Sequence, residues 1–295
     1  LSLIFSIHRR MDRAIDTSEI HAEIGERLRE ELDYLREAAH MRLYADIFAD
    51  DPRIAVPRVF EDLTTKRLLT MSWLEGEPIL SFREHPLEER NSIAETMFAA
   101  WWMPFSRYGV IHGDPHLGNY SVRTGSGSEG WGINLLDYGC IRIFPPSFVA
   151  GVVELYRALE THDRDRAAAA YENWGFRNLS ADLIDTLNVW ARFIYAPMLD
   201  NRVRSVADGI KPGDYGRKEA FGVHKRLREL GPVTPPREFV FMDRAAIGLG
   251  SVFLHLGAEL NFHRLFNETI EAFDATKLDK RQSAALKKAE VPLAA

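Results

Sequence analysis

Three polar side chains stand where they could handle a metal-bound phosphate. Asp114 lies five residues before Asn119 in a turn flanked by apolar residues, and Asp137 follows the apolar run 133–136. Phosphoryl transfer uses such parts, because a carboxylate orients or deprotonates the acceptor while an Asn and an Asp hold metal ions that bridge the phosphates. The residue types and their order therefore indicate phosphoryl-transfer chemistry.

The same step from Asp to Asn occurs in the protein-kinase catalytic loop, and the metal-binding Asp of those enzymes stands in Asp-Phe-Gly. Here Asp137 is followed by Tyr138 and Gly139, which keeps an aromatic residue at the middle position. Either half alone is a weak signal, because short Asp-x-x-x-x-Asn matches are frequent by chance. The purely structural alternative is a turn at Asp114, a cap or bend at Asn119 and a strand end at Asp137.

His112, Asp114 and His116 permit a second chemistry, zinc-dependent hydrolysis. Imidazole and carboxylate groups at alternating positions can converge on zinc. The sequence offers no second clear ligand cluster downstream. His116 is more simply interpreted as a ring that hydrogen-bonds within the loop and fixes the backbone around Asp114.

The elements that must position these residues divide into a small α/β part and a mainly helical part. Apolar residues recur at steps of three and four from Ile20 to Ala39, which predicts a long helix over 16–48. The β-like runs 54–60 and 67–73 predict a hairpin. A break at 75–78, a helix over 86–108, a strand over 133–136 and helices from residue 146 onward complete the prediction.

Two apolar features receive structural interpretations. Trp101 and Trp102 are expected in the core beneath the loop that carries Asp114. The run 245–258 is too short to span a membrane and is predicted to be a buried helix. The charged, Ala-rich tail after Lys277 is expected to be a frayed helix end.

Composition restricts the partners. With 295 residues, 46% of them hydrophobic, the chain can build a sizeable core, and its net charge of −6 provides no basic stripe for nucleic acid. The single cysteine, Cys140, cannot form an intramolecular disulfide, which favours a reducing compartment and a cytoplasmic location. No transmembrane segment is expected, and peripheral membrane association is left open.

Three segments together resemble the UbiB/AarF (ADCK) family of atypical kinases. Their order and approximate spacing match over most of the chain. The first segment discriminates best, because aminoglycoside and choline phosphotransferases share a similar loop but lack that helix pattern. The segments are Glu31-Leu32-Asp33-Tyr34-Leu35-Arg36-Glu37-Ala38-Ala39, His112-Gly113-Asp114-Pro115-His116-Leu117-Gly118-Asn119 and Leu136-Asp137-Tyr138-Gly139.

The resemblance implies an α+β, protein-kinase-like fold that uses ATP and Mg²⁺. Residues 1–76 would be a partial small lobe, with helix C and a β-hairpin leading to the hinge, and residues 77–295 the mainly helical large lobe. Asp114 would be the catalytic base, and Asn119 and Asp137 would bind magnesium. The remaining implied roles are loop support by His112, His116 and Gly139, and a hinge at Met71, Ser72 and Trp73.

The acids of the first helix have implied roles as well. Glu37 would be the helix C glutamate that pairs with the phosphate-binding lysine, and Glu31 with Asp33 would be the Glu-x-Asp pair of the family. The alternative for all three acids is a solvated helix face that pairs with Arg27 and Arg36.

The chain departs from the family pattern at several points. Leu117 stands where the family loop usually carries Pro, and Gly113 stands where it usually carries Ala. No lysine precedes Lys66, and the Lys-x-Gly-Gln element and the nucleotide loop of the family are missing. Either the sequence is a piece of a longer protein or the chain is a degenerate member, and we expect the former.

Three functions follow from these patterns. The first is an ATP-dependent phosphotransferase or ATPase with an unknown small-molecule, lipid or protein acceptor, linked by the resemblance to ubiquinone or lipid metabolism. The second is a pseudokinase that serves as a scaffold or binding module. The third is a small-molecule kinase of the aminoglycoside or choline type, for which Asp182, Asp185 and Asp200 could bind a cationic acceptor, although these acids are better explained as helix caps and solvated surface.

Overall fold

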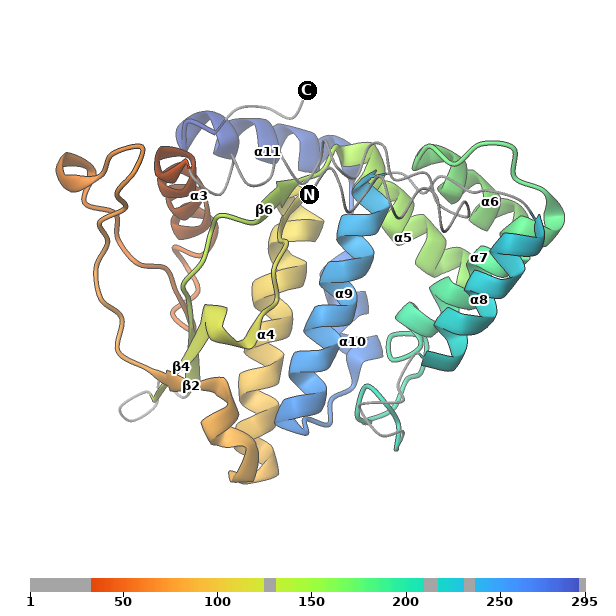
Figure 1. Cartoon of the computed structure of the whole chain (residues 1–295), viewed down its shortest axis with the longest axis horizontal. Coiled ribbons are helices and arrows are strands. Elements are labelled where there is room, and N and C mark those ends of the chain that lie inside the picture. Colours follow the sequence, from red (N-terminus) through yellow and green to blue (C-terminus); the bar gives the residue numbers. More distant parts are fainter. Residues whose placement is uncertain (1–32, 125–130, 210–216, 231–236, 292–295) are drawn as a thin grey trace, which may run out of the picture.

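The chain has mixed α and β structure in a computed structural model that describes residues 33–124, 131–209, 217–230 and 237–291 (Figure 1). A small sheet lies on the side of α3, and helices make up most of the rest. The strands are β1 Ile54–Ala55, β2 Glu77–Pro78, β3 Val110–His112, β4 Tyr120–Thr124, β5 Trp131–Leu135 and β6 Ile141–Ile143. The helices are α3 Tyr34–Ile47, α4 Leu87–Tyr108, α5 Pro146–Thr161, α6 Arg164–Asn173, α7 Ala181–Tyr195, α8 Arg217–Leu230, α9 Arg237–Leu256, α10 Phe262–Ile270 and α11 Ala275–Lys288.

The described part of the first predicted helix is α3. It begins after Asp33 and ends at Ile47, before the Asp-Asp-Pro sequence that cannot continue a helix. Met41, Leu43 and Tyr44 are almost completely buried and anchor it in the core. The predicted turns before residue 33, and with them Glu31, lie outside the described residues.

The predicted hairpin forms only in part. Val59 makes an antiparallel bridge with Met71, and the Ser72 N–H donates to Arg58 O at 2.8 Å. Ile54 instead pairs in parallel with Ile133 of β5. The hairpin prediction is therefore confirmed near Val59 and Met71 and wrong at Ile54, because the buried strand β5 offers Ile54 an apolar neighbour that the exposed second arm does not.

The strands of the described residues form a sheet in the order β1-β5-β4-β2 and a separate pair of β3 with β6. In the antiparallel β4–β5 ladder Tyr120 lies opposite Leu135, and the Leu136 N–H donates to Asn119 O at 3.0 Å. Asn119 and Asp137 therefore come to the same end of the sheet. The predicted strand over 133–136 is confirmed as β5, shifted by one or two residues.

The helix predicted over 86–108 is α4, which ends at Gly109 with a φ of 63°. Trp101 and Trp102 are buried as expected, and the Trp101 ring lies 6.0 Å from the ring of His112. In Figure 1, α9 runs beside α4, and the two helices are in contact. Ala245, Leu249 and Val252 bury one side of α9, so the apolar run 245–258 is a core helix.

The tail after Lys277 is not frayed, contrary to the prediction. It forms most of α11, which crosses one end of the molecule in Figure 1 and contacts α3, α4 and α5. Leu278, Gln282 and Leu286 repeat every four residues and are buried, and Lys288 Nζ lies 2.9 Å from Asp46 Oδ1. This stripe, set among Lys and Ala residues, gives the helix one buried face. None of the helices in the described ranges is long and apolar enough to cross a membrane.

Candidate active site

The loop that follows β3 is fastened to the segment that follows β5. The Gly113 N–H donates to Cys140 O at 2.9 Å, and a Cβ atom placed on Gly113 would lie 2.4 Å from the same oxygen. Residue 113 is glycine here because two backbone segments approach too closely for a side chain. The contact lies at the end of the antiparallel β3–β6 pair where Asp114 follows β3 and Asp137 precedes β6.

Asp114 is held by groups from its own loop. Asn119 Nδ2 donates to Asp114 O at 3.1 Å and to Asp114 Oδ2 at 3.3 Å, and the Tyr120 hydroxyl donates to Asp114 O at 3.4 Å. The Asp114 side chain nevertheless stays 30% exposed. The carboxylate is therefore oriented and still accessible to a ligand.

Asp137 sits in a tight turn. Its Oδ1 accepts the Gly139 N–H at 2.9 Å, which is the pattern of an Asx turn. Tyr138 points into the core, where its hydroxyl donates to Leu135 O at 3.0 Å and its backbone carbonyl accepts from His40 Nδ1 at 3.0 Å. The buried aromatic ring thus anchors the turn and leaves the Asp137 carboxylate at the edge of the sheet.

His112 supports the loop from below. Its ring is buried, and Nδ1 accepts the Asp114 N–H at 3.3 Å. Burial lowers the pKa of His112, and the nearby carboxylates of Asp137 and Asp114 offset only part of that effect. A neutral ring suits an acceptor of this N–H, and both acids lie close enough to His112 to act on it.

His116 shapes the turn that presents Asn119. Its Nδ1 accepts the Gly118 N–H at 3.1 Å and caps the 3-10 turn Leu117–Asn119. Both imidazoles are therefore engaged with loop amides through Nδ1. Across the described residues no group of three or more His, Cys, Asp and Glu side chains is arranged to hold a metal ion, which gives the zinc alternative no support.

Glu37 reaches from α3 to the same turn. Its Oε1 accepts the Tyr138 N–H at 3.3 Å. Burial raises the pKa of Glu37, the Tyr138 N–H acts in the opposite direction, and the Asp137 charge raises it further. Glu37 therefore lies beside Asp137, and its described contact is a backbone amide rather than the lysine implied by the resemblance.

The other predicted residues of the small lobe lie farther out. Asp33 pairs with Lys66, at 3.6 Å between Oδ2 and Nζ, across a turn in which Lys66 is largely exposed. Of the proposed hinge residues, Ser72 is hydrogen-bonded to Arg58, Met71 is partly exposed and Trp73 is 82% exposed. The chain then passes along the sheet, where Asn134 Nδ2 donates to Glu75 O at 2.9 Å.

One neighbour of the loop was not anticipated from the sequence. Arg244 of α9 lies with Nη2 3.5 Å from Asp114 Oδ1. Gly248 of the same helix packs on Pro115, so closely that a Cβ atom there would lie 2.0 Å from Pro115 Cγ. No motif or spacing in the sequence connects these residues with the loop, because the contact arises only from the packing of α9.

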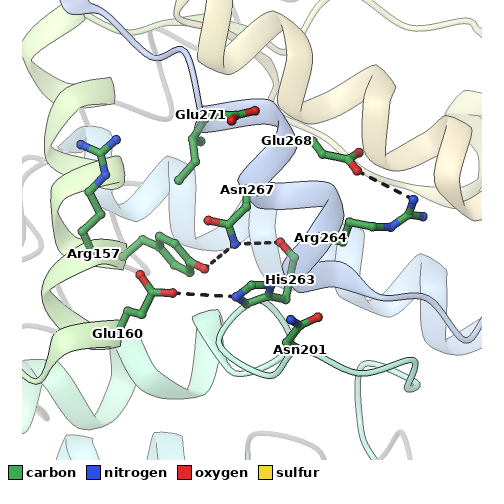
Figure 2. Close-up of a pocket in the computed structure, with 10 residues that line it drawn as sticks. Arg157, Glu160, Asn201, His263, Arg264, Asn267, Glu268 and Glu271 are labelled. Carbon is green, nitrogen blue, oxygen red and sulfur yellow. Dashed lines mark hydrogen bonds and ion pairs between the residues drawn. The ribbon is translucent and has the colours of Figure 1, made fainter.

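A hollow of about 540 Å³ lies elsewhere, between α5 and α10 (Figure 2). Asn267 Nδ2 donates to the Tyr156 hydroxyl at 2.7 Å, and His263 Nε2 lies 3.8 Å from Glu160 Oε1. These lining groups satisfy one another, and the hollow contains no residue of the Asp114 loop. The hollow is therefore separate from the candidate active site at the Asp114 loop.

The chemistry of the donors fits a magnesium ion. Both described bonds of the Asn119 amide use Nδ2, which leaves Oδ1 for a cation. Asp137 uses Oδ1 for Gly139, which leaves Oδ2. Magnesium prefers oxygen ligands and is commonly held by one or two protein groups together with phosphate oxygens and waters. These two residues meet that requirement.

The fold belongs to the kinase-like class. A solved complex of Rv3197 with erythromycin, from Mycobacterium tuberculosis, is similar over 90% of this chain and 64% of that chain, with a TM-score of 0.63 and 22% sequence identity. This likeness shows the fold. Residues 1–171 match the ABC1 atypical kinase-like domain, so the chain belongs to this family, the UbiB/AarF family. The predicted family and the α+β, kinase-like fold are confirmed.

Three relatives with kinase names are also similar to this chain in sequence. The mitochondrial atypical kinase COQ8 of Saccharomyces cerevisiae is 27% identical over 82% of this chain and 47% of its own length. The mitochondrial atypical kinase COQ8B of Rattus norvegicus is 30% identical over 84% of this chain and 46% of its own length. The chloroplastic protein ACTIVITY OF BC1 COMPLEX KINASE 1 of Arabidopsis thaliana is 34% identical over 81% of this chain and 33% of its own length. The chain spans about half the length, or less, of these relatives.

Proposed function

We propose that the chain carries the catalytic loop and metal-binding residues of an ATP-dependent phosphotransferase or ATPase of the UbiB/AarF type. The observation that carries the proposal is that Asn119 holds Asp114 and pairs through its backbone with the residue before Asp137. Asn119 Nδ2 lies 3.3 Å from Asp114 Oδ2, and the β4–β5 ladder continues through Asn119 to the residue before Asp137. Residues 1–76 act as a partial small lobe and residues 77–295 as the large lobe.

Each residue has a defined task in the proposed reaction. Asp114 orients the acceptor hydroxyl and receives its proton, while Asn119 holds Asp114 through Nδ2. Asn119 Oδ1 and Asp137 Oδ2 would hold a magnesium ion, which would supply positive charge to the phosphate oxygens. Glu37 fixes the Asp137 turn through the Tyr138 N–H and pairs with a phosphate-binding lysine from another part of the protein. The backbone of Met71, Ser72 and Trp73 serves as the hinge.

Substitution of Asp137 tests this function. In the full-length protein we expect Asp137→Asn to lower magnesium-dependent ATP turnover at least about 100-fold, because one charged metal ligand is lost. Asp165→Asn, an exposed acid in the first turn of α6, is the matched control and should turn over like the wild type. Unchanged turnover in Asp137→Asn would count against the assignment.

The acceptor belongs to the finer part of the proposal. The names of the COQ8 relatives and the resemblance direct the search toward ubiquinone or other lipid metabolism, with a small-molecule, lipid or protein acceptor. A cytoplasmic location, with peripheral membrane association left open, is proposed from the single cysteine of the sequence. Nucleic acid is not proposed as a partner.

A pseudokinase is the second candidate. It is favoured by the described contact of Glu37, which is with a backbone amide and not with a lysine. We expect the present residues by themselves to bind Mg·ATP weakly in isothermal calorimetry. Tight magnesium-dependent binding would contradict that expectation. An open reading frame upstream of Leu1 that encodes Lys-x-Gly-Gln and a strand lysine would favour the enzyme.

A further inference from the structure

One side of α9 is pressed against the catalytic loop. Phe241, Arg244 and Gly248, which we call the docking face, follow one another at steps of three and four and so lie on one side of the helix. Gly248 meets the buried Pro115, where even a methyl group would overlap the ring. This contact fixes the distance between α9 and the loop.

The other two members of the docking face bring in guanidinium groups. The Arg142 guanidinium lies over the Phe241 ring, 5.1 Å from its centroid, and Arg142 Cγ approaches Gly113. Arg244 lies with Nη2 3.5 Å from Asp114 Oδ1. Arginines of α9 and of β6 therefore both lie beside the loop, and Arg244 is the one paired with Asp114.

The Arg244–Asp114 pair is poorly explained as a contribution to folding stability. The Arg244 side chain is 69% exposed, and exposed ion pairs stabilise proteins very little. The pair does, however, complete the orientation of the carboxylate. Asn119 already occupies Asp114 Oδ2, and Arg244 faces Oδ1.

Arg244 also has donors to spare. A guanidinium carries five N–H donors in a planar fork that matches phosphate oxygens. The described contact with Asp114 is through Nη2, and most of the Arg244 side chain is exposed to solvent. In phosphoryl transfer an arginine placed beside the reacting phosphoryl group stabilises the charge on its equatorial oxygens.

We propose that Arg244 supplies, from α9, the cation beside Asp114: it positions the carboxylate and contacts the phosphoryl group in transfer. The inference rests on the proposed function. In that step the acceptor oxygen forms a bond to the γ-phosphorus, the bond from that phosphorus to the bridging oxygen breaks, ADP leaves, and the acceptor proton passes to Asp114. Residues 1–171 match the family model, and Arg244 lies beyond them. The helices that follow the matched residues therefore contribute this group.

The experiment compares three variants of the full-length protein in magnesium-dependent ATP turnover. We expect Arg244→Ala to lower kcat by about 10-fold to 1,000-fold, with KM for Mg·ATP changed by less than about threefold, since the lost contact forms in the transition state. Arg244→Lys should recover only part of kcat, because Lys keeps the charge and lacks the fork. Arg264→Ala is the matched control and should keep kcat, because Arg264 is similarly exposed and pairs with Glu268 at 3.7 Å on α10.

A binding measurement provides a second readout. Aluminium fluoride with Mg·ADP mimics the phosphoryl group in transfer, and the wild type should bind this combination more tightly than Mg·ADP alone. Arg244→Ala should lose that gain and keep its affinity for Mg·ADP, with an unchanged Tm. A double-mutant cycle with Asp114→Ala should show strong non-additivity.

The two levels of the proposal fail separately. If Arg244→Ala keeps kcat within about twofold and keeps the aluminium fluoride gain while Asp137→Asn abolishes turnover, the role of Arg244 is overturned and the proposed function stands. If Asp137→Asn also leaves turnover unchanged, the function and the inference fall together.

Discussion

Two helices from the last third of the chain, α9 and α11, both pack against the part of the fold that carries the Asp114 loop, and they do so in different ways. The core contact of α11 is buried and consists of Leu278, Gln282 and Leu286. The loop contact of α9 consists of a glycine against Pro115 and an exposed arginine against Asp114. The difference separates stability from chemistry, because buried apolar contacts stabilise a fold whereas exposed charges do so only weakly.

Gln282 shows what α11 holds in place. Its Nε2 donates to Tyr108 O at 2.7 Å and to Phe144 O at 2.9 Å. These carbonyls end α4 and follow β6, directly on either side of the β3–β6 pair that carries the loop. One buried amide thus satisfies two backbone acceptors at the base of the site, while α9 contacts the loop itself.

The first prediction concerns the buried contact of α11 and has the greatest expected consequence. Leu278→Ala removes a fully buried side chain and should lower the free energy of unfolding by about 2–5 kcal/mol. We expect Tm in differential scanning calorimetry to fall by roughly 10 °C, with ATP turnover per folded molecule unchanged at 25 °C. Lys280→Ala, exposed on the same helix, is the control. A Tm unchanged in both variants would show that α11 does not stabilise the core.

The second prediction concerns the contact of α9 with the Asp114 loop. Gly248→Ala forces a methyl group into Pro115 and should displace the loop, which lowers kcat about 10-fold to 100-fold because a shift of about 1 Å misplaces Asp114. Gly250→Ala is the matched change on the same helix, where the new Cβ would lie 3.6 Å from Val206 Cγ1, an ordinary contact. We expect Gly250→Ala to keep its activity. Equal activities of the two variants in a steady-state assay would remove the Gly248 contact from the explanation.

The third prediction concerns the pH dependence of stability that Asp243 of α9 causes. Burial raises the pKa of Asp243 to about 6, and the Trp190 N–H, which donates to Asp243 Oδ1 at 2.7 Å, acts against that rise. Because the folded-state pKa lies above the ordinary 3.8, stability should be highest below about pH 4 as far as this group is concerned, and should fall as pH rises to about 6.

Asp243→Asn removes this titration and keeps an acceptor for Trp190. We expect the variant to be about 1–2 kcal/mol more stable than the wild type above pH 6, with the difference shrinking toward pH 4. Urea unfolding at several pH values measures it. A difference that does not change with pH would contradict the assigned cause.

The fold of the Asp114 loop could be predicted from the sequence because its contacts are local. His112 with Asp114, His116 with Gly118, and Asp137 with Gly139 each join residues two positions apart. Such contacts are encoded in a short motif, and the resemblance supplied the order of the segments. The family and the kinase-like fold could therefore be anticipated, while the roles of the loop residues stay predictions.

The remaining features depend on contacts between distant residues. Ile54 pairs with Ile133 instead of the neighbouring arm, and Arg244 meets Asp114 only because α9 packs there. Neither contact leaves a spacing signal. The buried stripe of α11 does have a helical period. The surrounding Lys and Ala residues nevertheless led to the prediction of a frayed helix end.

Binding of a divalent metal ion by Asn119 and Asp137 can be measured directly. With Mn²⁺ in place of Mg²⁺ and ADP present, electron paramagnetic resonance of the full-length wild type should show protein-bound Mn²⁺. Asn119→Ala and Asp137→Asn should each release most of it, whereas Arg264→Ala should retain it. Equal Mn²⁺ binding by the wild type, Asn119→Ala and Asp137→Asn would contradict the claim that these side chains meet around one divalent ion.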